Sequence, residues 1–405
     1  MKSICILLQG HYEIDIRVRR KAEALASVGH HVDVLALRSS FSNTASYTLD
    51  GVNVHTLSLG KKRGSLARYI YEYLAFFAWV VLKLPGLMRR HRYAVVDVNT
   101  LPDFLVFAAF YARWKGAKLL LDMHEITPEF YISKYKVDPT HWLIRILKAV
   151  ERISMRYADH VITINEPIQE LLQSRGLSRS RSTVIMNTAD DRLFSPASVT
   201  PSTSSSRPAA FVMMYHGTLT HIYGLDIAIQ ALSIAHKRMP RAELWILGSG
   251  PEKDSLGRLS RQLNIESCVK FIGTVLPDEV YKWLAQCDIG VLATRQDIFL
   301  DYSFSNKLSE YVIMGKAVVA SRLKTIRHYF SEDALLFFEA GNPSELADRM
   351  VALFDDRALR RRLAENAKRE LQPIRWQVMR ERYLSLIRKL TESGQGRVET
   401  GNSSS

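Results

Sequence analysis

Two ionisable residues, Lys307 and Glu310, stand three positions apart near the start of a predicted helix at 305–314. Residues at this spacing share one face of a helix. A carboxylate placed there can accept hydrogen bonds from two hydroxyls of a ribose, and a lysine beside it can meet a phosphate. The pair therefore indicates nucleotide binding, against the alternative of an ordinary exposed salt bridge that contributes little.

Glycines follow two apolar runs at the points where helices are expected to begin. Gly248 and Gly250 come after the run 243–247, and Gly217 comes after the run 211–215. Turns of this kind expose backbone N–H groups at the positive end of a helix, which suits a pyrophosphate. Plain strand-to-helix connections would have the same composition, so each loop alone leaves both interpretations open.

Acids and a histidine follow strands in the first half of the chain. Asp122, His124 and Glu125 come directly after the run 118–121, and Asp15 and Arg17 lie in the segment after the first strand. Such side chains are suited to meeting a sugar or its acceptor by hydrogen bonding or proton transfer. A single histidine of this kind is more often structural, and Arg17 could simply stabilise the fold.

Short apolar runs alternate with helical patterns in both halves, which predicts an α/β chain of two doubly wound, Rossmann-like domains facing a central cleft. Ligands of such sheets bind at the carboxyl ends of the strands. Gly29 stands where a helix should end. The predicted parts are an acceptor-binding domain at 1–195, a Ser/Thr/Pro-rich linker at 196–208, a nucleotide-sugar-binding domain at 209–370, a helix at 371–392 that returns to the first domain, and a disordered tail at 393–405.

The composition excludes several classes of protein. A chain of 405 residues with 47% hydrophobic residues is long enough for two cores. Its three cysteines show no ligand spacing, so no metal site and no disulfide framework is expected. The net charge is +14, and the first 195 residues hold 27 Lys and Arg against 18 Asp and Glu. No nucleic-acid-binding module accompanies this charge.

The excess of positive charge is greatest around an apolar segment. Eight basic residues against one acid lie between Lys61 and Arg92, and they bracket the apolar run 73–82. Ten residues are too few to span a bilayer, which needs about twenty. The run could dock on an anionic surface, with 61–63 and 89–92 at the headgroups, or pack in the core of the first domain.

Over residues 1–390 the chain resembles the retaining GT-B glycosyltransferases of group 1, family 4. The similar stretches include LDMHE, VIMNTAD, YHGTLTHIYGLDIAIQAL, LWILGSGPEKDSL and above all SNKLSEYVIMGKAVVASRL. The resemblance implies a nucleotide-sugar donor in the second domain, an acceptor near the first, metal independence and retention of configuration. It also implies that Glu310 binds the ribose and that His124 lies near the donor sugar. The residues expected on the donor side are Gly217, Thr218, Leu219, Thr220, Gly248, Gly250, Gly273, Arg295, Ser305, Asn306, Leu308 and Glu310.

The chain departs from the family's pattern at two places. The family has a second glutamate eight residues before the matched one, where this chain has Tyr302, with Asp301 as the nearest acid. The Arg and Lys usual in the phosphate loop are replaced by Thr218 and Tyr223. We therefore expect Lys307, together with Arg295, to supply the positive charge. Asp297 or Asp301 is expected to hold sugar hydroxyls.

The expected activity is that of a hexosyltransferase that moves a sugar from a nucleotide-sugar donor to a saccharide or lipid-linked acceptor. The catalytic residues would be His124, Lys307 and Asp301, with Asp15, Arg17, Asp122 and Glu125 on the acceptor side, and no cofactor or metal would be needed. The setting would be the synthesis of surface polysaccharide or glycolipid, in the cytoplasm or on the inner face of the plasma membrane. A nucleotide-sugar epimerase and a non-catalytic scaffold are the alternatives.

Overall fold

The computed structural model describes residues 1–39, 44–59, 66–194 and 210–392. The predicted basic segment 61–63, linker 196–208 and tail 393–405 lie outside the described residues. The chain divides into two compact units, one made of Met1–Met186 and the residues from Met379 on, the other of Asn187–Val378. The division therefore falls earlier in the chain than the predicted domain end at 195.

The sheet of unit 1 has the order β3-β4-β2-β1-β5-β6-β7-β8, and all its neighbours are parallel except the pair β3 and β4. Buried apolar side chains run along both faces of its central strands, as expected for a sheet covered on both sides. Its strands are β1 (Ser3–Leu8), β2 (His31–Leu37), β3 (Ser46–Leu49), β4 (Val52–Leu57), β5 (Tyr93–Asn99), β6 (Lys118–Met123), β7 (His160–Thr163) and β8 (Ser182–Val184).

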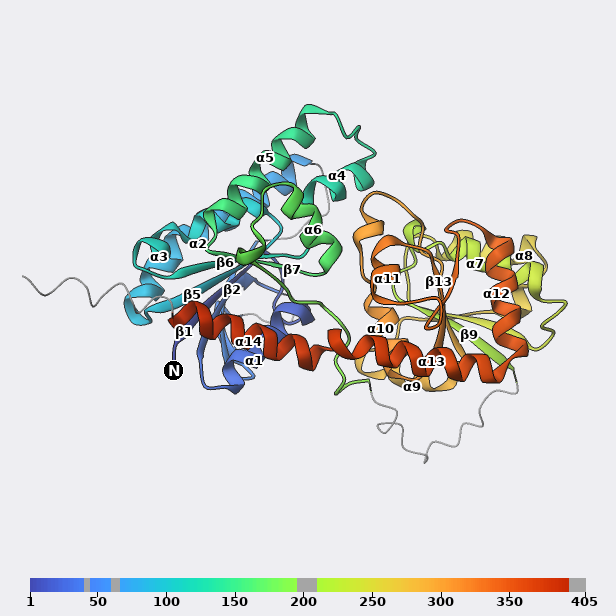
Figure 1. The fold of residues 1–405 in the computed structure, drawn as a ribbon. Coiled ribbons are helices and arrows are strands. Elements are labelled where there is room, and N and C mark those ends of the chain that lie inside the picture. The colour runs from blue at the N-terminus through green and yellow to red at the C-terminus, as the bar shows by residue number, and fades with distance from the viewer. Residues whose placement is uncertain (40–43, 60–65, 195–209, 393–405) are drawn as a thin grey trace, which may run out of the picture. The chain divides into compact units, whose positions relative to one another are not determined.

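Helices cover both faces of this sheet: α2 and α5 lie on one face, and α1 and α14 lie on the other (Figure 1). Asp15 caps the start of α1, and Gly29, with φ of +83°, follows the end of α1 as predicted. The helices of unit 1 are α1 (Ile16–Ser27), α2 (Leu66–Arg90), α3 (Phe110–Trp114), α4 (Thr127–Tyr135), α5 (Trp142–Tyr157), α6 (Glu166–Ser174) and the larger part of α14 (Trp376–Glu392).

Helix α2 corrects the expectation for the apolar run 73–82. The run belongs to a helix whose stretch Arg68–Arg90 has 23 residues and contains an 18-residue window with a mean hydropathy of 1.4, so it is long and apolar enough to cross a membrane by length and composition. The prediction counted only uninterrupted apolar residues, whereas flanking aromatic and aliphatic residues extend the helix. Phe76 and Val80 are fully buried, while Leu74 and Leu82 on the other side of the helix are 55% and 81% exposed. One face of α2 thus packs in unit 1 and the other is free.

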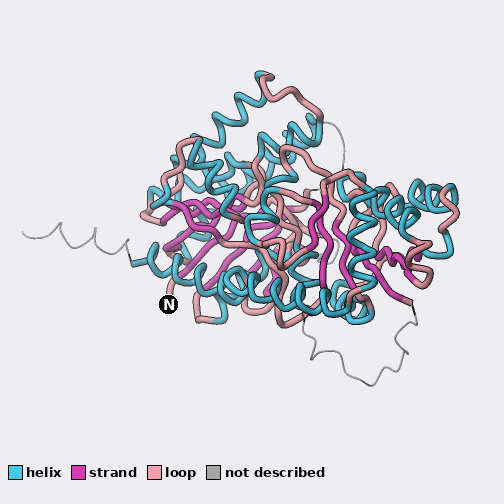
Figure 2. Tube along the Cα trace, turned by 45° about the vertical axis from the view of Figure 1, so that its right-hand side comes forward, coloured by secondary structure: helices cyan, strands magenta, loops and turns pink. Residues whose placement is uncertain are grey.

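The sheet of unit 2 has the order β11-β10-β9-β12-β13-β14 and is parallel throughout. In Figure 2 its strands stand between flanking helices, as do those of unit 1. The strands are β9 (Phe211–His216), β10 (Ala242–Leu247), β11 (Val269–Gly273), β12 (Ile289–Leu292), β13 (Ala317–Ser321) and β14 (Leu336–Phe338). The helices are α7 (Leu225–Ala235), α8 (Lys253–Gln262), α9 (Val280–Gln286), α10 (Asn306–Ile313), α11 (Lys324–Tyr329), α12 (Pro343–Asp355) and α13 (Arg357–Leu371).

Candidate functional site

Two glycine loops of unit 2 lie backbone against backbone at the carboxyl ends of β9 and β10. A Cβ atom on Gly250 would stand 2.3 Å from the carbonyl oxygen of Leu219, and one on Gly248 would stand 1.9 Å from that of Gly217. Gly217 and Gly248 also have φ of +126° and +127°, a region that L side chains rarely adopt. The glycines are therefore required by loop packing, whether or not a ligand binds.

Several of the expected N–H donors are already used by the fold. The amide of Gly217 donates to Leu247 O at 2.9 Å, and that of Leu219 donates to Ser249 O at 2.9 Å. Backbone N–H groups around residues 217–220 were expected to hold a diphosphate, and these two are already used within the fold. The amides of Thr218 and Thr220 have no backbone partner among the residues that the structure describes, and Thr220 Oγ1 is buried without a hydrogen bond there.

Lys307 extends from the first turn of α10 beside this loop. A Cβ on Gly217 would lie 2.4 Å from Lys307 Cε, so the glycine makes room for the lysine. The Nζ atom lies 4.2 Å from the ring centroid of Tyr223 and 5.5 Å from that of Tyr215. Burial lowers the pKa of Lys307, while the charge of Glu310 acts in the opposite direction. Among the described residues no carboxylate forms an ion pair with it, which leaves the cation open to an anionic ligand.

Glu310 belongs to a hydrogen-bonded chain that the sequence analysis missed. Its Oε2 forms a short hydrogen bond with Nε2 of His216, the last residue of β9. Nδ1 of His216 lies 3.1 Å from the hydroxyl of Tyr311, which donates to Met214 O at 2.6 Å. The sequence signal was a histidine at a strand end directly before Gly217.

The remaining polar residues expected on the donor side already form hydrogen bonds or ion pairs within the protein to different extents. Arg295 forms an ion pair with Asp226 at 2.5 Å and donates to His221 O at 3.1 Å. Oδ1 of Asp297 accepts from the amides of Phe299 and Leu300 at 2.9 and 2.7 Å. The Asp297 carboxylate thus caps a turn, and the charge of Arg295 is already paired with that of Asp226.

The Asp301 carboxylate is also engaged, because it accepts from the side-chain amide of Gln296 at 3.2 and 3.1 Å and from Lys324 N at 3.4 Å. Ser305 is the N-cap of α10 without a side-chain capping bond, and Asn306 is the first residue of that helix. The Leu308 side chain is fully buried in the core, so only its backbone could face a ligand. Gly273 ends β11 with φ of +89°, and its carbonyl accepts from Gly248 N.

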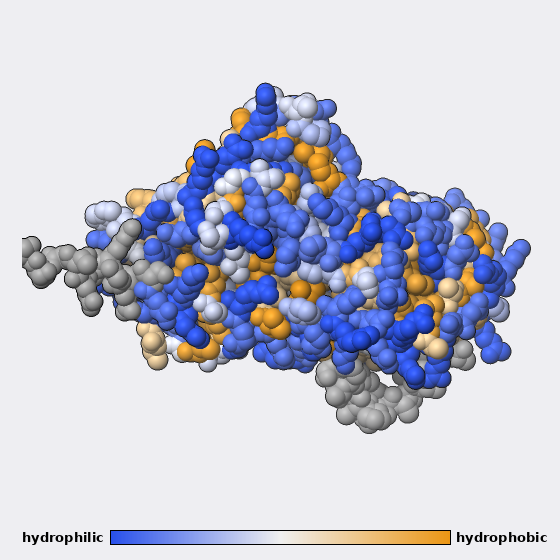
Figure 3. Space-filling model, viewed as in Figure 1, coloured by the Kyte–Doolittle hydropathy of each residue, from blue (hydrophilic) through white to orange (hydrophobic). Residues whose placement is uncertain are grey.

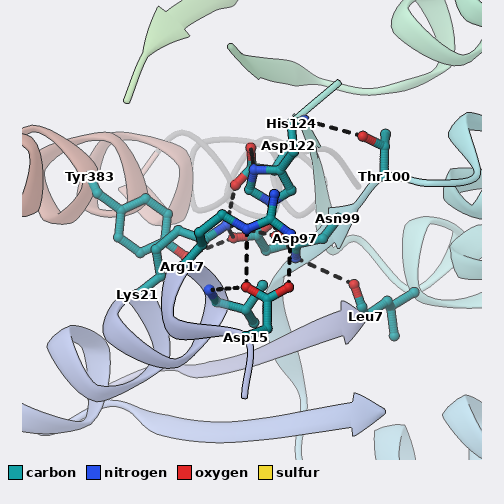
Figure 4. A network of polar contacts seen from close by, with 11 residues as sticks. Leu7, Asp15, Arg17, Lys21, Asp97, Asn99, Thr100, Asp122, His124 and Tyr383 are labelled. Carbon is teal, nitrogen blue, oxygen red and sulfur yellow. Dashed lines mark hydrogen bonds and ion pairs between the residues drawn. The ribbon is translucent and has the colours of Figure 1, made fainter. Parts of the chain in front are cut away.

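Unit 1 holds a buried polar network at the carboxyl ends of β5 and β6 (Figure 4). Lys21 from α1 donates to Asp97 Oδ2 at 3.2 Å, to Asn99 Oδ1 at 2.9 Å and, in a short contact, to Asp122 Oδ2. Tyr383 of α14 donates to Asp97 Oδ2 at 2.8 Å. Because the lysine and both carboxylates are buried, their mutual pairing is what makes the network tolerable in the core.

No sequence pattern pointed to Lys21, Asp97, Asn99 or Tyr383, because a buried network has no local pattern. Asp122 was expected among the members of this region, and so was His124. Its Nε2 lies 2.8 Å from Asn99 Oδ1, and its backbone N–H donates to Thr100 Oγ1 at 3.2 Å. Burial, with the charges of Arg17 and Lys21, holds the pKa of His124 well below its usual value.

The other residues expected on the acceptor side surround this network. Asp15 accepts two hydrogen bonds from Arg17, at 3.1 and 2.8 Å, and caps α1 through Val18 N at 3.3 Å. Burial raises the pKa of Glu125, partly offset by the charge of Arg17. Asp15, Arg17, Asp122, His124 and Glu125 therefore all belong to unit 1, whereas Lys307 and Asp301 belong to unit 2.

Another cluster of histidines and an acid lies at the opposite ends of the strands of unit 1. The potential ligand atoms of His31, Asp33 and His91 are within 4.8 Å of one another. The Asp33 carboxylate accepts from Tyr93 at 2.5 Å and pairs with His31 at 2.8 Å and His55 at 3.3 Å. These contacts lower the pKa of Asp33 to about 2 against the effect of burial. His31 and Asp33 thus have hydrogen-bonding partners within the fold, and the ring of His91 stacks on that of His31 with the centroids 3.9 Å apart.

Comparison with known proteins matches both parts of the chain to glycosyltransferase families. Residues 14–188 match the glycosyl transferase 4-like domain, and residues 210–356 match glycosyl transferases group 1. The D-inositol 3-phosphate glycosyltransferase of Paenarthrobacter aurescens is 22% identical over 90% of both chains. The sulfoquinovosyl transferase of Arabidopsis thaliana is 22% identical over 68% of this chain. A lipopolysaccharide core biosynthesis glycosyltransferase of Rhizobium meliloti is 24% identical over 53% of this chain. The chain spans 52% and 60% of the length of the last two.

Solved structures show the same fold. Sucrose-phosphate synthase from Thermosynechococcus elongatus superimposes with a TM-score of 0.76 and 19% identity, over 97% of this chain and 100% of that one. The Anabaena protein Alr3699/HepE, solved in complex with UDP, gives a TM-score of 0.70 and 20% identity, over 96% of this chain and 100% of that one. The two parallel α/β sheets are those of the GT-B fold, and by both of its domains the chain belongs to the GT-B glycosyltransferases.

Proposed function

We propose that the protein is a retaining, metal-independent hexosyltransferase that moves a sugar from a nucleotide-sugar donor to a saccharide or lipid-linked acceptor. The observation that carries the proposal is the arrangement around Lys307. Its ammonium group has no ion-pair partner among the described residues and stands beside a loop whose Thr218 and Thr220 amides lack backbone partners. A cation and N–H donors at the ends of parallel strands suit a diphosphate.

In the proposed reaction, the bond between the anomeric carbon and the phosphate oxygen breaks while an acceptor hydroxyl attacks from the same face. The hydroxyl proton passes to the departing phosphate, so a nucleoside diphosphate leaves and a glycoside forms. Lys307 and the two threonine amides would stabilise the negative charge that develops on the leaving group. Glu310 would hold the ribose, and unit 1 would bind the acceptor through residues around His124.

The relatives support a lipid-linked acceptor in the synthesis of surface polysaccharide or glycolipid. One of them is named for lipopolysaccharide core biosynthesis and another for transfer of sulfoquinovose. The solved relative in complex with UDP supports a nucleotide-linked donor. The alternatives to test against are a nucleotide-sugar epimerase and a scaffold that binds the donor without turning it over.

Incubation with a panel of labelled UDP-, GDP- and ADP-sugars, with and without polyprenyl-linked acceptors, tests the activity. Acceptor-dependent release of nucleoside diphosphate, unchanged by EDTA, is the expected result. An isomerised donor without release would identify an epimerase, and binding without any turnover would identify a scaffold. The anomeric configuration of the product, read by NMR coupling constants, tests retention.

We further propose that the protein works in the cytoplasm, on the inner face of the plasma membrane, with helices α2 and α5 of unit 1 against the lipid. On α5 the apolar residues Trp142, Ile146 and Ile153 are 64%, 48% and 55% exposed. Its three arginines at 145, 152 and 156 are exposed beside them, and its one acid, Glu151, is buried and paired with Arg175.

An apolar stripe lined by cations suits an anionic headgroup layer. Orange side chains lie among blue ones at the tip formed by α4 and α5 (Figure 3). Flotation with vesicles of phosphatidylcholine and phosphatidylglycerol tests this docking. Ile146→Ser with Ile153→Ser should lower the bound fraction severalfold. Ile234→Ser, at a residue of unit 2 that is 51% exposed, is the matched control and should bind as the wild type does. Equal binding of all forms would contradict the proposal.

A further inference from the structure

The hydrogen bonds around Tyr311 fix the position of one proton on His216. The hydroxyl of Tyr311 lies 2.6 Å from the carbonyl oxygen of Met214, which can only accept. Its single proton is therefore used in that bond. Nδ1 of His216, 3.1 Å from the same hydroxyl oxygen, must then be the donor. His216 thus carries a proton on Nδ1.

The proton on Nδ1 of His216 determines how its ring can bond to Glu310. In neutral imidazole a proton on Nδ1 leaves a lone pair on Nε2, and Nε2 faces the carboxylate oxygen Oε2 of Glu310 in a short contact. Two acceptors do not form a hydrogen bond, so His216 and Glu310 must hold one further proton between them. A charge-assisted bond of this kind is short and directional. It fixes Oε2, and Oε1 has no partner among the described residues.

The other end of the chain is held rigidly in the core. Tyr311 is fully buried, and a Cβ on Gly290 of β12 would lie 2.6 Å from its ring. The ring therefore packs flat on the backbone of β12, where a larger residue would displace it. His216 itself ends β9 and is 92% covered, with 8% of its side chain exposed. The chain from Gly290 through Tyr311 and His216 to Glu310 thus connects rigid strands to a single carboxylate.

We propose that His216 is a positioning residue that orients the Glu310 carboxylate so that Oε1 receives the ribose hydroxyls of the nucleoside diphosphate. The inference rests on the proposed function, because it takes the ligand of Glu310 to be a ribose. His216 does not touch the reacting atoms in this assignment. Its contribution is selectivity for a ribonucleotide over a deoxyribonucleotide, since a misdirected carboxylate no longer distinguishes them.

Two substitutions of His216 each retain one of the two hydrogen bonds that its imidazole ring makes. The amide nitrogen of Gln can stand near the place of Nε2, so His216→Gln keeps a donor for Glu310. That of Asn stands near the place of Nδ1, so His216→Asn keeps only the bond to Tyr311. The probe is whichever of UDP, GDP or ADP the wild-type protein binds, compared with its 2′-deoxy form by titration calorimetry. Wild type and His216→Gln should prefer the ribonucleotide by about tenfold.

His216→Asn should lose most of that preference, with kcat at saturating donor near the wild-type value. If His216→Asn does not fold, Tyr311→Phe is the second variant, and it should reduce the preference because His216 Nδ1 loses its acceptor. Unchanged discrimination in the folded variant would overturn the inference alone. A wild type that binds none of the three nucleotides would overturn the proposed function, and this inference with it.

Discussion

Oδ1 of Asp122 lies 3.6 Å from Nδ1 of His124, and neither buried atom has a hydrogen-bond partner in the described part of the chain. The side-chain amide of Asn99 explains the arrangement. Its nitrogen donates to Leu7 O and to Asp97 Oδ1, both at 3.3 Å, so its oxygen must accept from His124 Nε2. Neutral His124 therefore presents a bare Nδ1 to Asp122, and only a proton on Asp122 can join them.

We expect Asp122 to hold that proton in mildly acidic solution. Burial is the largest cause that raises the pKa of Asp122 to about 6, although Lys21 opposes it. In the unfolded chain the pKa of this carboxyl would be about 3.9. Between the two values the folded state binds more protons, so the free energy of unfolding should fall as pH rises from about 4 to about 6, by about 1.4 kcal/mol for each pKa unit. Asp122→Asn should flatten that slope in urea titrations.

Asp103 provides a matched comparison for this measurement. Burial raises the pKa of Asp103 to about 7, with the Thr127 hydroxyl acting against it. In the wild type, Asp103 should make the free energy of unfolding fall as the pH rises to about 7, one unit beyond the window assigned to Asp122. Asp103→Asn should remove that part of the decrease. If the free energy of unfolding of Asp122→Asn falls with pH as steeply as that of the wild type, Asp122 does not hold the proton that faces His124.

Lys307→Met should separate stability from activity. The lysine is desolvated between two tyrosine rings, and its lowered pKa means that the fold disfavours its charged form. Replacement by an apolar side chain should therefore leave the free energy of unfolding at pH 7 no lower than that of the wild type. In contrast, kcat/KM for the donor should fall about 100-fold if the cation stabilises the leaving diphosphate.

The control for this variant is Lys282→Met, at an exposed lysine that pairs with Glu279 in unit 2. It should match the wild type in kcat/KM. Calorimetric melting and steady-state kinetics on the same preparations give both quantities. A Lys307→Met protein that keeps wild-type kcat/KM would remove this residue from the proposed mechanism.

The two sheets and the location of the candidate site could be predicted from the sequence, because both depend on local patterns. The predicted runs 243–247 and 289–293 coincide with the buried strands β10 and β12, and a helix does begin just before Lys307. Strands β3, β4 and β8 of unit 1 were not predicted. In β3 and β4 polar residues interrupt any apolar run, and β8 has only three residues. The length of α2 was also underestimated.

The partners of the polar groups could not be predicted, because they join residues that are far apart in sequence. Arg295 was expected to be open to phosphate, but it pairs with Asp226. Gly217 was expected to offer its amide to a ligand, but Leu247 O accepts it. His216 was not identified although it contacts Glu310. A sequence shows which residues carry hydrogen-bonding groups, whereas only the fold shows which of these groups are already satisfied.

The ion pair between Arg295 and Asp226 should contribute modestly to stability. Their side chains are 29% and 31% exposed, so solvent screens the interaction. In a double-mutant cycle with Arg295→Gln and Asp226→Asn, we expect a coupling free energy of about 0.5–1 kcal/mol. Urea unfolding of the wild type, both single variants and the double variant gives this value. Zero coupling would show that the arginine is free to serve a ligand instead.

Two glycines of unit 2, Gly250 in a loop and Gly257 in the helix that follows, should respond in opposite ways to the same substitution. In Gly250→Ala the new Cβ would meet Leu219 O at 2.3 Å and Leu219 N at 2.6 Å. These are backbone atoms of the facing loop, so the loops must separate, and we expect a loss of about 1–3 kcal/mol in the free energy of unfolding.

Gly257, in contrast, lies inside α8, and a Cβ there would meet nothing within 4 Å. Gly257→Ala should raise the free energy of unfolding by about 0.5–1 kcal/mol, because alanine loses less conformational entropy than glycine in a helix. Because Gly250→Ala also displaces the loop that carries Thr218 and Thr220, it should weaken nucleotide binding, whereas Gly257→Ala should not. Urea unfolding and calorimetric nucleotide titration of both variants check the pair. A Gly250→Ala protein as stable as the wild type would show that the two loops can separate at no cost, and that their close approach does not hold the threonine amides in place.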